Sequence, residues 1–207
     1  MRHGETYEPR PETRLPGPDE DPHLPLTARG RERLAEVARW MADLRLAALY
    51  TSPYARSLET ARAIGAPHGL TPTPLEPLRE LAVHPPPGGT LGDVARRYVQ
   101  LVRDLQQKAE HDVLLDCGRS LGAILDEACA TLEGTIARHE GTVLVVAHGG
   151  LNRFLLGRWL GMPAARAIAI EQNFACVNVI EFRGGHPWVR AVNLTLHDPL
   201  KVGAAGV

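Results

Sequence analysis

TVLVVAHGG, residues 142–150, is the stretch that sets the fold of this chain. Its first half is a continuous run of β-branched and other apolar residues, which is typical of a parallel-sheet strand covered on both faces. The run ends at His148, and Gly149 and Gly150 then lead into residues 151–162, which have the composition of a helix. The stretch therefore predicts a strand followed directly by a helix, as in α/β proteins.

The same order of strand and helix occurs earlier in the chain. LAALYTS (46–52) predicts a short buried strand, and ARSLETARAIG (55–65) predicts the helix that follows it. Two longer helices are expected within residues 93–110 and 120–140. Alternating strands and helices predict an α/β fold, a three-layer α/β/α sandwich around a mostly parallel central sheet. Two strand-like segments that flank Gly184–Gly185 predict an antiparallel hairpin near the end.

The composition narrows the class of protein. Lys and Arg together number 23, and Asp and Glu together number 24. This balance argues against a nucleic-acid-binding surface or a membrane-surface patch. Three cysteines without a Cys-x-x-Cys pair, and a polar N-terminus without a signal-peptide pattern, predict a cytoplasmic protein. We expect one domain over residues 1–207, with neither a nucleic-acid nor a membrane partner.

Several polar side chains follow the predicted strands at their carboxyl ends. Arg2 and His3 would end a first strand, Arg56 follows the strand at 46–52, and His148 ends the run quoted above. Ligands of open α/β sheets bind beyond the carboxyl ends of the strands, so we expect these side chains to converge. Arginines and the helix start at Gly149 suit a phosphoryl group, because guanidinium groups offer paired donors and helix N-termini attract anions.

A histidine in such a pocket is a nucleophile as well as a ligand. Neutral imidazole attacks phosphorus and forms a covalent intermediate, and positive neighbours lower its pKa and keep it neutral. A leaving alkoxide needs a proton, so a carboxylic acid is expected nearby. Glu80, in PLRELAV, is the best-placed acid of the sequence.

Four motifs, taken in order along the chain, point to a known family. They are RHGET (2–6), TSPYARSLETA (51–61), LRE (78–80) and VVAHGG (145–150). In this order they resemble the histidine phosphatase superfamily, the phosphoglycerate-mutase-like proteins, and the resemblance covers essentially the whole chain.

This resemblance implies a role for each matched residue. His3 would be the phosphorylated nucleophile, and Glu80 would be the proton donor. Arg2, Arg56 and His148 would form the phosphate pocket. The family implies no metal ion and no organic cofactor for phosphatase chemistry.

The start of the chain departs from the family pattern. An apolar strand normally precedes Arg-His-Gly in the family, whereas here only Met1 precedes Arg2. We therefore expect the first strand to be truncated at the N-terminus. Our hypothesis is that the native product begins further upstream with several more apolar residues.

Three further residues are candidates for the pocket. Asn152 follows Gly149-Gly150 within the first helical turn, where it either lines the pocket or serves the helix start. Arg119, in CGRSL, either adds positive charge at the rim or belongs only to the start of a helix with Ser120 as N-cap. His84 lies four residues after Glu80 and is the first alternative for the acid role.

The preferred function is hydrolysis of a small-molecule phosphomonoester, and two alternatives remain. A phosphoglycerate-type phosphomutase would return the phosphoryl group to its bound substrate. The segments YEPR (7–10) and LAVHPP (81–86) stand where the mutases of this family carry other motifs, which weighs against that alternative. The second alternative is a catalytically weak phosphate-binding or interaction domain. The sequence leaves the physiological substrate and the oligomeric state open.

Overall fold

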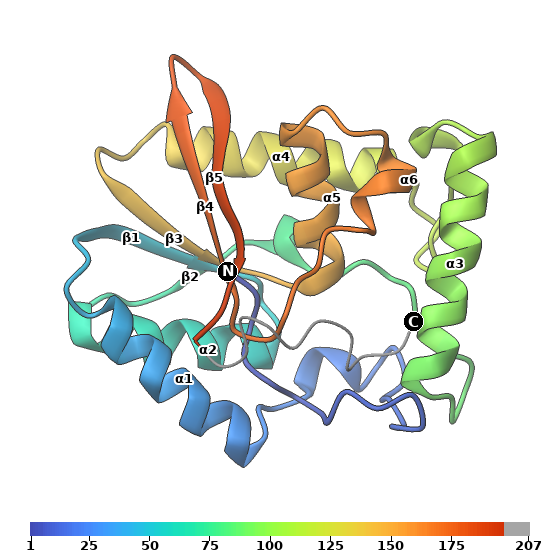
Figure 1. Ribbon diagram of the computed structural model, residues 1–207, viewed down its shortest axis with the longest axis horizontal. Coiled ribbons are helices and arrows are strands. Elements are labelled where there is room, and N and C mark those ends of the chain that lie inside the picture. Colours follow the sequence, from blue (N-terminus) through green and yellow to red (C-terminus); the bar gives the residue numbers. More distant parts are fainter. Residues whose placement is uncertain (197–207) are drawn as a thin grey trace.

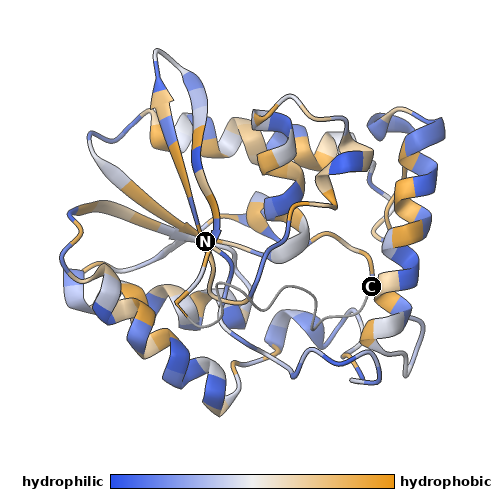
Figure 2. Cartoon of the chain, in the orientation of Figure 1, coloured by the Kyte–Doolittle hydropathy of each residue, from blue (hydrophilic) through white to orange (hydrophobic). Residues whose placement is uncertain are grey.

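A parallel sheet of three strands lies at the centre of the structure, a computed structural model that describes residues 1–196. The strands are β1 (Leu46–Thr51), β2 (Thr73–Pro74) and β3 (Thr142–Val146), in the order β2-β1-β3. Both pairings are parallel, as the sequence predicts. Figure 2 shows that β1 is mostly hydrophobic, whereas residues along α1 and α3 alternate in hydropathy. This contrast is expected when a sheet is covered on both faces and helices on one.

Helices flank the sheet on both sides, so the α/β prediction is confirmed. Figure 1 shows α1 and α2 on one side of β1 and β3, and α4 with α5 on the other. The helices are α1 (Ala28–Met41), α2 (Ala55–Gly65), α3 (Leu91–Gln107), α4 (Leu121–Ile136), α5 (Gly149–Trp159) and α6 (Ala164–Ala167). Single 3-10 turns are η1 (Asp21–His23), η2 (Ala66–His68), η3 (Glu76–Leu78) and η4 (Glu110–Asp112).

The apolar side chains form two cores, one on each side of the sheet. The first includes Leu34 of α1, Ile64 of α2 and Val146 of β3. The second includes Leu125 of α4 and Phe154 of α5. Each of these side chains is at most 1% exposed. Two separate cores divided by one sheet are the packing that a three-layer sandwich requires.

Local capping explains where the long helices begin. The side chain of Thr27 accepts a hydrogen bond from the Gly30 N–H at the start of α1. Thr90 and Asp93 cap the start of α3 reciprocally in a capping box. Ser120 accepts from the Ala123 N–H at the start of α4.

The N-terminal segment takes the place of a strand beside β3. Arg2 forms one isolated parallel bridge with Ala147, and the Met1 ammonium donates to the Val145 carbonyl at 2.6 Å. On its other side, the Arg2 N–H donates to the Cys176 carbonyl. The backbone of residues 1–3 therefore forms hydrogen bonds both to the end of β3 and to the residue before β4, but only over these few residues. β3 and β4 are close together near Met1 and diverge from there toward the hairpin turn (Figure 1).

The C-terminal hairpin is β4 (Val177–Arg183) and β5 (His186–Leu194), which pair antiparallel. Gly184 and Gly185 have φ angles of +56° and +80°, which L side chains rarely adopt. The hairpin predicted at Gly184–Gly185 is thus confirmed.

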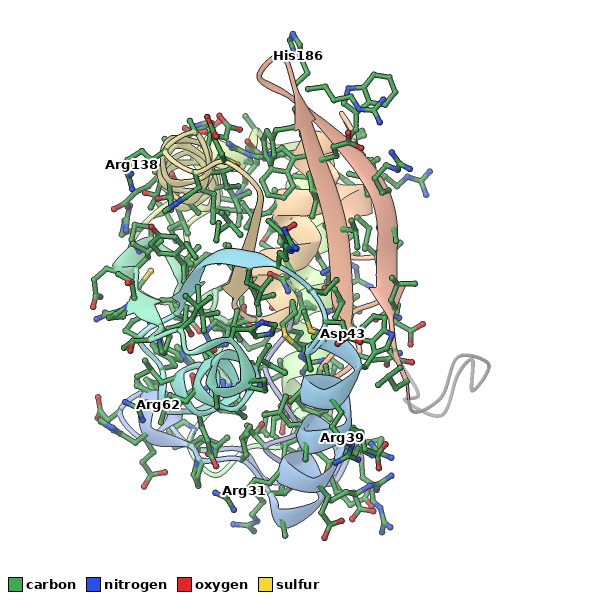
Figure 3. The ribbon with its side chains drawn as sticks, turned by 90° about the vertical axis from the view of Figure 1, so that its left-hand side faces the viewer. Arg31, Arg39, Asp43, Arg62, Arg138 and His186 are labelled. Carbon is green, nitrogen blue, oxygen red and sulfur yellow. The ribbon has the colours of Figure 1, made fainter. Side chains whose placement is uncertain are left out.

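The outer faces of the helices carry charge. Figure 3 shows Arg31, Arg39 and Arg62 at the outer surface of α1 and α2. Among residues 1–196, no helix has both the length and the apolar content needed to cross a membrane. The predicted single domain extends over residues 1–207 and thus includes residues outside the described part. That boundary and the cytoplasmic location remain predictions.

Candidate active site

Three elements bring His3, Arg56 and His148 together at the carboxyl ends of β1 and β3. His3 follows the Arg2 bridge, Arg56 lies in the first turn of α2, and His148 follows β3. The rings of His3 and His148 have centroids 5.1 Å apart, and Arg56 Nε lies 3.2 Å from His3 Nε2. All three residues are at most 4% exposed. The expected convergence therefore occurs.

The hydrogen bonds of His3 fix the position of its ring proton. His3 Nδ1 lies 2.8 Å from the Gly4 carbonyl oxygen, which only accepts, so Nδ1 carries the proton. Nε2 accepts from Arg56 Nε and therefore carries the lone pair. Burial, together with the positive charges of Arg56 and Arg2, holds the pKa of His3 well below its usual range. His3 is thus a neutral imidazole whose Nε2 faces an arginine.

Arg56 is hydrogen-bonded to Asp21, which lies in the loop region before α1. Its NH1 donates to the Asp21 carbonyl at 2.6 Å, and its NH2 donates to the Asp21 carboxylate at 3.1 Å. Its guanidinium also lies 4.8 Å from the centre of the Tyr54 ring. Asp21 therefore sets the orientation of the guanidinium and leaves its Nε toward His3. A Pro-rich loop carries no spacing signal that would have predicted this pairing.

Arg2 lies between an aromatic ring and the start of α5. Its NH1 donates to the Gln172 carbonyl at 2.5 Å, and its guanidinium carbon is 3.9 Å from the centre of the Phe174 ring. A Cβ at Gly149 would lie 3.1 Å from Arg2 Nε. Glycine at 149 thus allows the guanidinium to approach the N-terminus of α5 closely.

His148 occupies the N-cap position of α5 with its ring enclosed. Its Nε2 lies 2.7 Å from Ser52 Oγ, and the Tyr54 ring centre is 5.0 Å from the His148 ring centre. Burial, together with the positive charges of Arg56 and Arg2, holds the pKa of His148 well below its usual range. The second imidazole of the site is therefore also neutral.

Two nitrogens of this cluster have no hydrogen-bond partner within the described residues. They are Arg2 Nε and His148 Nδ1, and both are buried. Buried polar groups are normally hydrogen-bonded, so these positions suit a ligand that supplies acceptors. With two arginines beside them, the matching ligand is an anion such as a phosphoryl group. No group of three or more His, Cys, Asp or Glu side chains that could hold a metal ion occurs among residues 1–196.

Glu80 lies at the N-terminus of α5, where it is bound by backbone N–H groups. Its Oε1 accepts from the N–H groups of Leu81 and Leu151, both at 2.9 Å, and its Oε2 accepts from Gly150 N–H at 3.1 Å. A Cβ at Gly150 would lie 2.3 Å from the Tyr98 hydroxyl oxygen and 2.7 Å from Glu80 Oε1. Glycine at 150 is therefore required for the carboxylate to reach the helix end.

The three further candidates have different surroundings. Asn152 is buried and donates at 3.3 Å to Oε1 of Gln172, the same residue whose backbone carbonyl accepts from Arg2. Arg119 pairs at the surface with Glu127 of α4. The backbone N–H of His84 donates to Asp116 at 2.9 Å. The structure thus links Asn152 to the cluster and gives Arg119 and His84 acidic partners elsewhere.

An open pocket of about 450 Å³ adjoins the cluster. Tyr54, which contacts His148, is one of its walls, and His23 and Arg79 are others. Sequence reasoning did not single out Tyr54 or Ser52, although both stand in the motif that contains Arg56. Their proximity to Arg56 in the sequence was the available signal.

Comparison with known proteins identifies the family of the chain. Residues 1–195 match the sequence model described as the histidine phosphatase superfamily (branch 1). The chain belongs to the histidine phosphatase superfamily. This histidine phosphatase fold is shared by YhfR of Bacillus stearothermophilus, with a TM-score of 0.72 and 26% identity, over 91% of this chain and 92% of that one.

Other relatives of this superfamily are named as phosphatases. A probable 2-carboxy-D-arabinitol-1-phosphatase of Arabidopsis thaliana is 27% identical over 87% of this chain. A 2-carboxy-D-arabinitol-1-phosphatase of Triticum aestivum is 32% identical over 78% of this chain. The chain spans only 39% and 33% of the lengths of these two proteins. Phosphoserine phosphatase of Entamoeba histolytica, solved with 3-phosphoglyceric acid, shares the fold at 20% identity, with a TM-score of 0.72 and 95% of both chains covered.

Proposed function

We propose that the chain hydrolyses small phosphomonoesters through a phosphohistidine formed on Nε2 of His3. The observation that carries this proposal is the fixed tautomer of His3. Its Nδ1–H is bound to the Gly4 carbonyl, so the lone pair is on Nε2, beside Arg56. A neutral imidazole with its lone pair in an arginine-lined site is an activated nucleophile.

The phosphoryl group is proposed to bind to Arg2, Arg56, His148 and the backbone N–H of Gly149. Arg56 Nε–H, which now donates to His3, would turn to a phosphoryl oxygen and release the Nε2 lone pair for attack. The two unpartnered nitrogens, Arg2 Nε and His148 Nδ1, would gain acceptors at the same time. Positive charge around the equatorial oxygens stabilises the phosphoryl group during transfer.

In the first step, the bond from His3 Nε2 to phosphorus forms as the bond to the leaving oxygen breaks. We propose that the carboxyl group of Glu80 gives its proton to that oxygen. In the second step, Glu80 takes a proton from water, the water oxygen bonds to phosphorus, and the bond to Nε2 breaks. The cycle consumes water and the ester, releases alcohol and phosphate, and restores both residues. Glu80 Oε2 accepts from the N–H of Gly150, which lies two residues after His148 at the same helix end, and this position supports the role.

The pocket beside Tyr54 is proposed to hold the leaving group. Its wall contains the aromatic ring of Tyr54 and the positively charged Arg79, and His23 lies at the same pocket. The other lining residues, Pro22, Pro53, Ala55 and Leu58, are apolar, and Arg79 also pairs with Glu76, so the pocket suits a small leaving group with an apolar part and a polar or anionic end. The phosphatase names of the curated relatives favour hydrolysis over the phosphomutase alternative.

The test is phosphate release from a panel of phosphomonoesters without added metal. The panel includes phosphoserine and 3-phosphoglycerate, and the variant His3→Ala is compared with the wild type. His186→Ala is the matched control, because His186 is exposed at the start of β5, at the tip of the hairpin (Figure 3). We expect release by the wild type and the control and none by His3→Ala.

A direct trap would identify the intermediate. Rapid quenching in alkaline detergent, which preserves phosphohistidine, should leave labelled phosphate on the wild type and not on His3→Ala. Phosphate release by His3→Ala at the wild-type rate would refute the nucleophile assignment. Transfer of the label back to a bound ester, without release, would instead support the phosphomutase.

A further inference from the structure

Ser52 is a buried polar residue of the cluster to which the proposed mechanism assigns no role. It directly follows β1, it is fully buried, and its own N–H donates to the Val146 carbonyl of β3 at 2.9 Å. These constraints fix its hydroxyl oxygen between two groups. The Tyr54 N–H is 3.3 Å away, and His148 Nε2 is 2.7 Å away.

The donors and acceptors at this hydroxyl determine the direction of each hydrogen bond. A backbone N–H only donates, so Ser52 Oγ accepts the bond from Tyr54. The hydroxyl has one proton, and the nearest acceptor for it is His148 Nε2. If Nε2 donated instead, the buried hydroxyl proton would have no acceptor among its described neighbours, at a substantial energetic cost.

We infer that Ser52 is a positioning residue that selects the ring tautomer of His148, placing the proton on Nδ1 and the lone pair on Nε2. His148 Nδ1 is the buried nitrogen without a partner. In this tautomer it presents an N–H to a bound anion, whereas the other tautomer would present a lone pair and repel it. The lowered pKa of His148 agrees, because only a neutral ring has a tautomer to select.

The two histidines of the site thus carry the proton on the same atom and serve different purposes. The Nδ1–H of His3 donates to the Gly4 carbonyl, and its Nε2 lone pair accepts from Arg56. The Nε2 lone pair of His148 accepts from the Ser52 hydroxyl, and its Nδ1–H is available to donate to a bound anion. One ring is prepared as a nucleophile and the other as a donor.

Ser57 provides a matched control at the same nitrogen. Its Oγ lies 3.5 Å from His148 Nε2, at the limit of a hydrogen bond, and it is as fully buried as Ser52. Replacing Ser57 also removes a buried serine hydroxyl beside His148, but it leaves the 2.7 Å hydrogen bond between Ser52 and His148 intact.

The tautomer is measured by two-bond proton–nitrogen correlation NMR on protein labelled with ¹⁵N-histidine, with His148→Gln used to assign the His148 signals. We expect Nε2 of His148 to show the shift of an unprotonated nitrogen in the wild type and in Ser57→Ala. In Ser52→Ala the signals should move toward a tautomer mixture. A protonated Nε2 in the wild type, or a Ser52→Ala spectrum identical to that of the wild type, would overturn the inference.

The wild-type spectrum keeps the inference testable if Ser52→Ala fails to fold. The NMR measurement also requires no turnover. If the protein had no phosphatase activity, the proposed function would be refuted, and the spectrum would still decide the tautomer of His148. The kinetic consequence does rest on the proposed function. With an active wild type, kcat of Ser52→Ala should fall about tenfold, the change equivalent to one ordinary hydrogen bond, and Ser52→Thr should recover part of it. An undiminished kcat in folded Ser52→Ala would contradict the inference.

Discussion

Replacing Glu80 with Gln separates the structural role of this residue from its proposed role as an acid. The carboxylate accepts three backbone N–H groups at the start of α5, two on Oε1 and one on Oε2. Glutamine keeps one acceptor oxygen. If that oxygen takes the place of Oε1, the amide NH₂ faces the Gly150 N–H, donor against donor.

The expected loss of stability follows from this count. A buried backbone donor without an acceptor costs about 1–3 kcal/mol. A middle value of about 2 kcal/mol lowers the Tm of a protein of this size by roughly 4–8 °C. Glu76→Gln is the control, because Glu76 pairs with Arg79 at the surface, where removing the pair costs at most about 1 kcal/mol.

The assays are thermal unfolding without substrate and hydrolysis of two esters by the folded variant. An alkyl phosphate needs a protonated leaving group, whereas p-nitrophenol leaves without one. Glu80→Gln should therefore lose far more activity on the alkyl ester. A Tm equal to that of the wild type would refute the capping argument. Equal losses on both esters would refute the acid role and leave the capping argument intact.

Three other predictions concern the same region. The free energy of unfolding should fall as the pH is lowered from 7.5 to 5.5, because His3 and His148 stay neutral in the folded protein and take up protons in the unfolded chain. Urea titrations of the wild type and of His148→Gln measure how steeply the free energy of unfolding changes with pH, and this dependence should be weaker in the variant. Adding four β-branched residues before Met1 should raise Tm more than adding four Gly-Ser residues. Either extension turns the buried Met1 ammonium, whose pKa is lowered to about 6, into an amide that still donates to Val145, but only the β-branched residues favour a strand that pairs with β3; equal Tm values of the two extended proteins would contradict this. Arg56→Lys should lower kcat by about 10²–10³-fold through loss of the guanidinium donors, and a change in KM alone would indicate a role only in ground-state binding.

Much of the fold could be read from local sequence. The β-branched run at 142–146 forms β3, Ser120 caps α4, and Gly184–Gly185 turns the final hairpin. Each of these depends on neighbouring residues only, through side-chain branching, a capping hydroxyl or a positive φ angle.

The convergence of His3, Arg56 and His148 could also be predicted, because parallel strands end at one edge of their sheet. The sequence could not tell how each side chain is held there. Arg56 is oriented by Asp21, 35 residues away. Glu80, expected beside the leaving group, is engaged by the backbone of α5, 70 residues away.

The sequence by itself therefore determined β1, β3, most of the long helices and the final hairpin, and which residues meet at the carboxyl ends of β1 and β3. Only the tertiary structure decided the hydrogen-bond partners, and with them the tautomer of His3, the contact of Ser52 with His148 and the capping role of Glu80. The physical reason is range. Propensity and periodicity act over a few residues, whereas a buried donor takes whichever acceptor the packed layers bring within about 3 Å of it.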